Sequence, residues 1–391
     1  MAACVDRKKL GALWRGAATL AMFLTFAAAT PVAAVEMREF PTKKVPVMVE
    51  TIASDLEHPW AIEVLPSGDY LVSERPGRMR IIHDGKISPP IAGVPKVYSG
   101  GQGGLLDVAL DPDFESSRKL YFSASIRGEG GQGTAIFSAR LSDDGRSLDD
   151  VKRIFAMNRF TTRPQHFGSR IAIAPDGSLF FGIGDRGSAD RAQDLRDHAG
   201  SILHINADGT IPASNPYLGS TDGLPEIWSK GHRNPQGITF DPKENILYTV
   251  EHGARGGDEI NKPEPGKNYG WPVISYGKHY SGAEIGEGTA KEGYEQPLHY
   301  WDPSIAPGAI AIYRGAMFPE WDGDYLVAAL KYELLARLEH DDTGEVVAEE
   351  RLFKGEFDRM RDVKVAPDGS ILLLTDSENG SLLRILRSDL H

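Results

Sequence analysis

The chain has 391 residues, of which 41% are hydrophobic and 25% are charged, so it can supply the core of a folded protein. Its 55 acidic residues outnumber 43 basic ones, and the net charge of −12 argues against nucleic acid as a partner, because phosphate recognition needs clustered Lys and Arg. The 43 glycines and 25 prolines are spread along the chain and indicate many turns.

Residues 1–34 have the pattern of a cleaved secretory signal peptide. Four basic residues precede an apolar stretch, 16–30, and small residues at 32–34 offer a cleavage site. An uncleaved membrane anchor is the alternative, because the apolar stretch nearly reaches spanning length. The only cysteine, Cys4, lies in this segment. We therefore expect the mature chain, 35–391, to be periplasmic or secreted, without disulfides and without stable membrane insertion.

A tight turn followed by a short apolar strand recurs along the rest of the chain. The prolines of these turns are about 45 to 77 residues apart, the length of one four-stranded blade with variable loops. Six copies predict an all-β fold, a six-bladed β-propeller of four-stranded antiparallel blades; a β-sandwich with similar turns is the alternative. The copies begin at Leu65, Asp111, Ala174, Asp241, Pro319 and Ala366.

The repeat also predicts where polar groups gather. If every copy is the equivalent strand of its blade, the residues just after the copies lie on one face, around one channel. Most of them are charged, which suggests a polar funnel. They are Glu74-Arg75, 125–127, Asp185-Arg186, Glu251-His252, Leu330-Lys331 and Asp376-Ser377.

Two segments before and after the fourth copy are rich in polar groups. Residues 231–237, Gly-His-Arg-Asn-Pro-Gln-Gly, combine a guanidinium with two amides on a stiff turn, which suits an anionic ligand with carbonyls. An inter-blade turn is the alternative. Residues 251–259 and 266–272 combine glycine-rich backbone with carboxylates, the oxygen donors that Ca²⁺ prefers, although the spacing is not that of an EF-hand. A solvated acidic loop would have the same composition.

Other candidate residues lie outside that region. His166, in Pro-Gln-His-Phe-Gly-Ser-Arg, has an ordinary pKa near neutrality and is a candidate general base, although most histidines are not catalytic. Arg359 and Arg361 lie two residues apart on an expected strand and point the same way, either into a site or into a surface salt-bridge face. Trp301 offers a flat ring, for stacking or for the core.

Taken together and in this order, these segments resemble the soluble glucose/sorbosone dehydrogenase family that depends on pyrroloquinoline quinone (PQQ), and especially its aldose sugar dehydrogenases. The matches run from Gly-Gly-Gln-Gly-Gly-Leu-Leu at 100–106 to Leu-Thr-Asp at 374–376. Residues 231–237, Gly-Asp-Glu-Ile-Asn at 257–261 and Asn-Tyr-Gly-Trp-Pro at 268–272 are highly specific to it. The fold of the family is a six-bladed propeller.

The resemblance implies an oxidation. His166 would take the proton of the sugar C1 hydroxyl while hydride passes from C1 to PQQ C5, giving reduced PQQ and the aldonolactone. Gln102 and Asp185 would lie near that centre, and Arg233 beside the reacting quinone oxygens. An external acceptor would then take up the electrons.

The resemblance also assigns the cofactors, PQQ and Ca²⁺. The backbone carbonyls of Gly253 and Ala254 would hold a catalytic Ca²⁺, and Glu259 and Tyr269 a second, structural one. The remaining family positions would bind PQQ through amides, through cations that neutralise its carboxylates, and through a stacked ring. These positions are Asn234, Gln236, Lys331, Arg359, Arg361 and Trp301.

Three departures from the family pattern shape the expected specificity. Gln165 precedes the base where glucose-oxidising relatives carry Asp, and Ala254 replaces a proline. The segment from Tyr269 to Trp301 lacks the long insertions of the glucose dehydrogenases. We therefore expect an open site, broad aldose specificity and a monomer. Two other functions stay open, a calcium-dependent propeller lactonase and a non-catalytic sugar-binding propeller.

Overall fold

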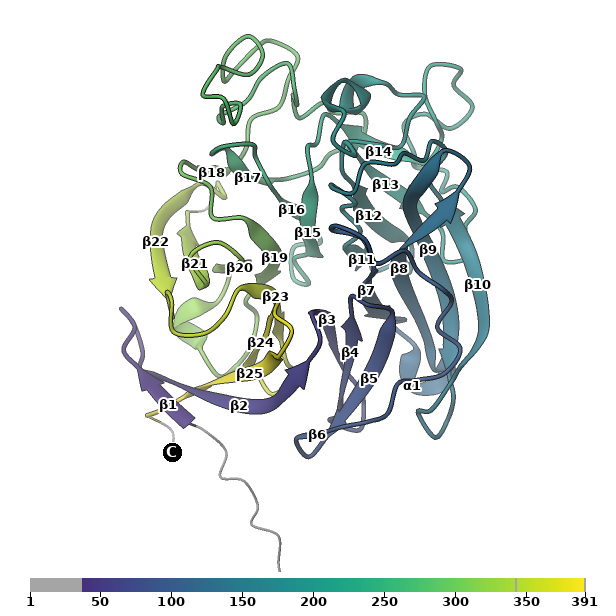
Figure 1. The fold of residues 1–391 in the computed structure, drawn as a ribbon. Coiled ribbons are helices and arrows are strands. Elements are labelled where there is room, and N and C mark those ends of the chain that lie inside the picture. Colours follow the sequence, from purple (N-terminus) through teal and green to yellow (C-terminus); the bar gives the residue numbers. More distant parts are fainter. Residues whose placement is uncertain (1–36, 342, 390–391) are drawn as a thin grey trace, which may run out of the picture. The chain divides into compact units, whose positions relative to one another are not determined.

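The computed structural model describes residues 37–341 and 343–389, and the predicted signal segment, 1–34, lies outside the described residues. Within them the chain forms six antiparallel sheets around a common axis (Figure 1). Helical structure in this part is limited to short pieces: α1 (Phe114–Ser117), η1 (Ala189–Gln193) and η2 (Pro319–Trp321). The predicted six-bladed propeller is confirmed.

The first three sheets follow one another along the chain. The first holds β3 (Pro59–Val64), β4 (Tyr70–Glu74), β5 (Arg78–His83) and β6 (Lys86–Ile87). The second holds β7 (Leu105–Leu110), β8 (Lys119–Gly128), β9 (Gly131–Leu141) and β10 (Leu148–Ala156). The third holds β11 (Ile171–Ile173), β12 (Leu179–Ile183), β13 (Ser201–Ile205) and β14 (Ile227–Lys230).

The last three sheets complete the ring. The fourth holds β15 (Pro235–Phe240), β16 (Leu247–Glu251), β17 (Asp258–Asn261) and β18 (His299–Trp301). The fifth holds β19 (Pro307–Ile312), β20 (Tyr325–Ala329), β21 (Leu334–His340) and β22 (Val346–Leu352). The sixth holds β23 (Met360–Val365), β24 (Ile371–Thr375) and β25 (Gly380–Arg387), joined by β2 (Val47–Leu56) and β1 (Met37–Phe40) from the start of the described chain.

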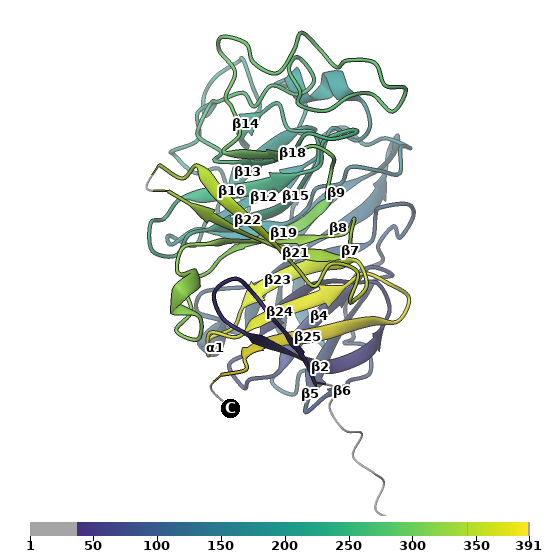
Figure 2. The ribbon, with the colours of Figure 1, turned by 90° about the vertical axis from the view of Figure 1, so that its left-hand side faces the viewer.

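The sixth sheet closes the ring because β2 pairs antiparallel with β25, from Val47 opposite Arg387 to Leu56 opposite Gly380. The two views show these strands side by side although they come from opposite ends of the sequence (Figures 1 and 2). Hydrogen bonds between the two ends tie the first and last blades together, so the circle cannot open without breaking a sheet.

The first strand of each sheet lies innermost. The strands β3, β7, β11, β15, β19 and β23 contact one another in that order, and β23 contacts β3. The repeated turn of the sequence leads in each sheet into the second strand, β4, β8, β12, β16, β20 or β24. The prediction of one equivalent strand per copy is therefore confirmed. Glycine suits these turns because the backbone has positive φ there, 88° at Gly68, 82° at Gly177 and 83° at Gly369.

Apolar side chains fill the spaces between neighbouring sheets. Leu105, Leu120 and Phe122 are fully buried in the largest of these layers, where Phe122 stacks on Phe137 with 5.0 Å between ring centroids. The core is thus distributed around the ring and leaves the axis to the innermost strands. Charged residues of three of those strands line the central channel, namely Glu63 of β3, Asp107 of β7, and Asp362 and Lys364 of β23.

Candidate active site

The ends of the second strands meet on one face, at a cavity of about 200 Å³ that we call the upper cavity. Four of the six expected positions after the repeat contribute to it, namely Arg75, His252, Leu330 and Asp376. Arg127 does not; its guanidinium lies 4.7 Å from the Tyr98 ring. The other lining residues are Trp60, Gly101, Gln102, Asn234, Gln236, Arg359 and Arg361.

His166 and Asp185 form a hydrogen-bonded pair beside this cavity. The Nδ1 atom of His166 lies 2.6 Å from Oδ1 of Asp185, an oxygen that also accepts the backbone N–H of Gly187 at 2.6 Å. The second carboxylate oxygen accepts the indole N–H of Trp271 at 2.8 Å. Because Asp185 engages Nδ1, the ring is held in one orientation and Nε2 is the nitrogen left to exchange protons.

The backbone at His166 is also fixed. Its N–H donates to the side-chain oxygen of Gln102 at 2.8 Å, and Gln102 lines the upper cavity. The φ angle of His166 is 56°, a left-handed conformation that is rare outside glycine and is retained only where surrounding contacts enforce it. Burial lowers the pKa of His166 against the opposing effect of Asp185, and the charge of Arg233 lowers it further.

The charge on Asp185 is favoured by its partners. Burial alone would raise the pKa of this carboxyl group. The hydrogen bond and charge of His166, the charge of Arg233 and the N–H of Gly187 outweigh that effect and hold the pKa below its ordinary value. The pair is therefore an anion next to an imidazole that stays neutral at neutral pH.

Arg233 comes from the Gly-His-Arg-Asn-Pro-Gln-Gly segment that precedes and opens β15. Its guanidinium donates to the carbonyls of His252, at 3.0 Å, and Gly253, and lies 5.2 Å from the Trp271 ring. Its Nε is buried and has no hydrogen-bond partner within the described residues. From the same segment, Asn234 accepts the N–H of Gly168 at 3.3 Å. This segment thus ties the loop of His166 to the loop after β16.

Arg361 supplies a buried cation to the upper cavity, with 8% of its surface exposed. It donates to the side-chain oxygen of Gln236 at 3.0 Å and to Asp376 at 2.6 Å. Burial lowers the pKa of Arg361, opposed by Asp376. Burial alone would raise the pKa of Asp376, but Arg361 and the hydrogen bond of His58 lower it to about 2. Asp376 is therefore ionised and its charge is shared by two partners.

Two residues expected to bind a cofactor are not among those that line the upper cavity. Trp301 is 3% exposed and packs in the apolar core with Ile305, Ile310 and Tyr325. It lies on β18, the outermost strand of the fourth sheet, and the stacking role expected from the sequence stays a prediction. Lys331 is exposed, lies 4.8 Å from the Tyr332 ring and is not among the residues that line the upper cavity.

The expected metal ligands lie along the loop after β16 and on β17. A small cavity of about 20 Å³ is lined by Glu251, Gly253, Glu259 and Tyr269, among others. Burial, together with the charge of Glu251, raises the pKa of Glu259. Asn261 donates to Glu251 at 2.9 Å and to Glu259 at 3.1 Å. Its own side-chain oxygen is buried without a partner among the described residues, so three oxygen-bearing side chains meet with one acceptor unused.

The phenol of Tyr269 is not available to this group. It donates to the carbonyl of Lys262 and accepts the N–H of Glu264 at 3.1 Å. Any metal contact of Tyr269 must therefore use its backbone oxygen. Ala254, which follows Gly253, is partly exposed.

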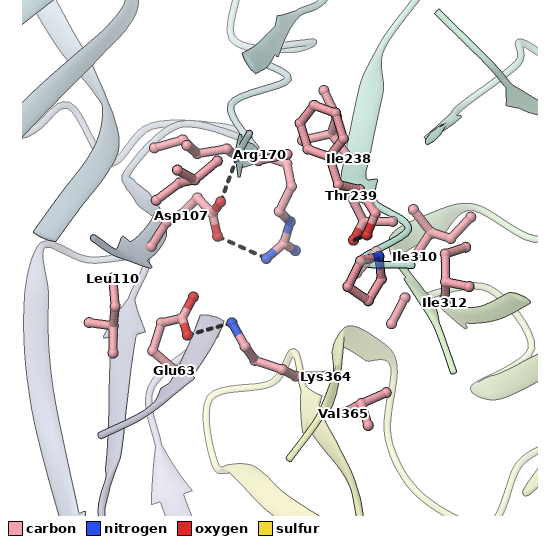
Figure 3. A pocket seen from close by; sticks show the side chains of 18 of the residues that line it. Glu63, Asp107, Leu110, Arg170, Ile238, Thr239, Ile310, Ile312, Lys364 and Val365 are labelled. Atoms are coloured by element: carbon pink, nitrogen blue, oxygen red, sulfur yellow. Dashed lines mark hydrogen bonds and ion pairs between the residues drawn. The ribbon is translucent and has the colours of Figure 1, made fainter. Parts of the chain in front are cut away.

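A larger cavity, of about 570 Å³, opens at the other end of the channel, and we call it the lower cavity (Figure 3). Arg170 binds Asp107 at 2.9 Å and Asp362 at 3.0 Å, and Lys364 is paired with Glu63. Arg170 also lies 4.1 Å from the ring of Trp60, which lines the upper cavity. Arg170 therefore separates the two cavities, and each cation of the lower one is paired with at least one carboxylate.

Several residues of the site escaped the sequence assignment. Arg75, His252 and Asp376 carried a signal, because they follow repeat strands, but no role was assigned to them. Trp271 belongs to the Asn-Tyr-Gly-Trp-Pro motif. Trp60, between Arg170 and Arg361, has no local pattern that marks it, since its position depends on β3 lining the channel.

No helix in residues 37–341 and 343–389 has the length and apolarity to span a bilayer.

The chain is similar to aldose sugar dehydrogenase YliI of Escherichia coli, with 40% identity over 345 residues that cover 87% of this chain and 92% of that protein. The solved structure of the soluble aldose sugar dehydrogenase of Escherichia coli in its apo-form has a TM-score of 0.84 at 39% identity, covering 87% of this chain and 99% of that one.

A solved PQQ-bound aldose sugar dehydrogenase of Streptomyces coelicolor has a TM-score of 0.71 at 28% identity, covering 91% of this chain and all of that one (100%). A sequence model of the glucose/sorbosone dehydrogenases matches residues 56–384, most of the chain. The protein described above therefore belongs to the glucose/sorbosone dehydrogenase family.

Proposed function

We propose that this protein oxidises aldose sugars at C1 to aldonolactones, with PQQ as the electron acceptor and Ca²⁺ as its partner. The observation that carries the proposal is the His166–Asp185 pair, joined through Gln102 to a cavity rich in cations. A neutral imidazole beside an anion-binding cavity suits removal of a proton from a neutral alcohol. Export to the periplasm and a monomeric state are expectations that accompany this proposal.

The upper cavity suits PQQ because the molecule carries three carboxylates. Arg75, Arg359 and Arg361 line the cavity, and its one carboxylate, Asp376, is already paired with Arg361 and His58. A net positive lining therefore remains for an anion. Trp60 adds a flat apolar face. When bound, PQQ would supply a two-electron acceptor, and Ca²⁺ would polarise the accepting carbonyl.

The oxygen donors near Gly253 suit a hard cation. The carbonyl of Gly253 already accepts a hydrogen bond from Arg233, so Arg233 and a Ca²⁺ at Gly253 and Ala254 would share that oxygen or Arg233 would shift. For the structural Ca²⁺, Glu259 and the backbone of Tyr269 would be joined by Glu251 and the free oxygen of Asn261. A cation there would lower the pKa of Glu259, which burial raises in its absence.

The residues of the chain have distinct parts in the proposed reaction. Nε2 of His166 accepts the C1 hydroxyl proton, and Asp185 stabilises the resulting imidazolium through Nδ1. The ordinary pKa of a histidine is about 6.5. Because the pKa of His166 is lowered, its imidazole stays neutral, and can accept a proton, at pH values at which an ordinary histidine is already protonated. Trp271 and Gln102 hold the carboxylate and the backbone of this pair in place.

A metal-dependent hydrolase of the lactonase type would need a cation held by side-chain carboxylates from several blades. In the part of the chain that the structure describes, no three or more His, Cys, Asp or Glu side chains lie together in a way that could hold a metal. The cationic upper cavity and the His166–Asp185 pair, for which such a hydrolase has no use, favour the dehydrogenase.

Reconstitution tests the proposal directly. The purified chain is mixed with PQQ and Ca²⁺, an aldose is added, and reduction of a redox dye is followed. We expect dye reduction that requires both cofactors, with the lactone as product. Lactone opening without PQQ would support the hydrolase, and sugar binding without either reaction would support a binding protein; both outcomes would refute the proposal.

A further inference from the structure

Arg186, which directly follows the carboxylate partner of the proposed base, has no role in the function described so far. It is fully buried, with 0% of its surface exposed. Its guanidinium donates to the backbone carbonyl of Arg163, at 2.8 Å, and to that of Gln165. Asp185 binds the ring of His166, so two consecutive residues contact the same segment, one at the imidazole and one at the backbone just before it.

The far side of the same segment is also in contact with Arg186. Its guanidinium lies 3.5 Å from the ring centroid of Phe167, which is 1% exposed. The guanidinium therefore touches residues on both sides of His166 and spans the turn that carries it. Since a guanidinium is planar and has several donors, it can bind two carbonyls and an aromatic face at once, which lysine cannot.

The burial of this cation is unusual because no carboxylate within the described residues forms an ion pair with it. Burial lowers the pKa of Arg186 to about 9, and Nε has no partner in that part of the chain. An apolar side chain would fill the space without the cost of desolvating a charge. Such a side chain would, however, leave the carbonyls of Arg163 and Gln165 without this donor, so what the arginine contributes here is its hold on the backbone that carries His166.

Backbone strain marks the same place. His166 and Arg186 both have left-handed φ angles, 56° and 54°, although neither is glycine. Such conformations persist where surrounding contacts enforce them, and they gather at functional sites. The contacts that enforce them here are those between the two segments, since Arg186 binds the backbone before His166 and Asp185 binds its ring.

We infer that Arg186 is a positioning residue for the proposed base, which holds the 163–167 turn so that Nε2 of His166 faces the substrate. This inference rests on the proposed function of His166. It adds that Asp185 and Arg186 hold the turn at two places. The carboxylate of Asp185 orients the imidazole of His166, and the guanidinium of Arg186 binds the backbone just before it.

The charged groups that face His166 are Asp185, Arg233 and Arg186. Asp185 raises the pKa of the imidazole, and the two arginines lower it. Removal of the positive charge of Arg186 should therefore raise the pKa of His166, which NMR can measure. A loss of packing elsewhere in the fold would not change this pKa.

The test compares Arg186→Met and Arg186→Lys with the unaltered chain. In Arg186→Met we expect kcat at saturating sugar to fall about 10²-fold, because a misplaced base loses its alignment, with little change in the Kd for PQQ. Titration of histidine-labelled protein by NMR, without cofactor, should show a higher pKa for His166, whose signal is identified by its loss in His166→Ala. Arg186→Lys keeps the positive charge, so the pKa of His166 in this variant should stay near that of the unaltered chain. Its kcat should lie between those of Arg186→Met and the unaltered chain, because lysine cannot bind both carbonyls and the aromatic ring.

Arg191→Met is the matched control. Arg191 is a nearby, largely buried arginine that binds Asp197 at 2.7 Å and the carbonyl of Arg159 at 2.7 Å, away from the turn of His166. We expect lower stability without a change in the pKa of His166.

The outcomes separate the two proposals. An unchanged kcat and pKa in Arg186→Met, or the same changes in Arg191→Met, would overturn the role of Arg186. If Arg186→Met does not fold, an unaltered kcat in Arg186→Lys would overturn it equally. Full activity in His166→Ala would instead refute the proposed base, whatever Arg186 does.

Discussion

The two ends of the central channel contain similar residues in different states of pairing. At the lower cavity, Arg170 is held by two aspartates and Lys364 by Glu63, so each cation has an internal partner. Figure 3 shows the pairs of Arg170 with Asp107 and of Lys364 with Glu63. At the upper cavity one carboxylate, Asp376, faces three arginines. A larger volume therefore does not identify the functional end. A surplus of cations over carboxylates identifies it better here, because cations without an internal partner are costly unless an anionic ligand uses them.

The largest expected effect comes from removing the base at the upper end. His166→Ala should lower kcat about 10²–10⁴-fold while PQQ still binds, because proton abstraction is lost and the cationic lining is retained. The measurement is steady-state dye reduction together with PQQ titration. His83→Ala, on an exposed imidazole, is the control and should behave like the original chain. Unchanged turnover in His166→Ala would remove the functional distinction between the two ends.

A cation from each end can be compared directly. Arg361→Ala should weaken PQQ binding by about 10²-fold, the loss of about 2–3 kcal/mol that truncation of a buried charged partner brings. Lys364→Ala, at the lower end, should leave PQQ affinity unchanged and reduce stability instead, because Glu63 loses its partner. Isothermal titration with PQQ and thermal unfolding separate the two results. Equal losses of PQQ affinity would contradict the assignment of the cofactor to the upper cavity.

The smallest effect on activity is expected from protonation of Asp107 at the lower cavity, which should change stability and not turnover. Burial raises the pKa of Asp107 to about 7, so the folded state binds a proton more tightly than the unfolded state does. This contribution to the free energy of unfolding is fully present below about pH 4 and is lost as pH rises through about 7.

Asp107→Asn should flatten that decline and leave the pH dependence of turnover unaltered. Urea unfolding between pH 4 and 8 measures the first quantity, and dye reduction over the same range measures the second. A changed pH profile of turnover would show that the lower end is coupled to the reaction.

The sequence predicted the repeat unit well because the blade is a local structure. A Pro-Asp-Gly turn followed by an alternating apolar strand is legible within ten residues, and six copies of it predicted six blades. The chemical character of the site was equally legible, since Arg233, Asn234 and Gln236 stand in one short motif that resembles a known family. The role of Trp301 is less legible, because a tryptophan has the same local pattern in a core, where this one packs, and in a binding site.

The sequence by itself therefore determined the fold class and the equivalence of the six repeat strands. It also determined most of the polar residues near the channel. Only the tertiary structure decided which of them meet: that Asp185 holds His166, that Trp271 donates to Asp185, and that Arg170 divides the channel. The reason is physical. A blade forms from neighbouring residues, whereas the site lies on the ring axis, where residues more than a hundred positions apart come into contact only after the circle closes.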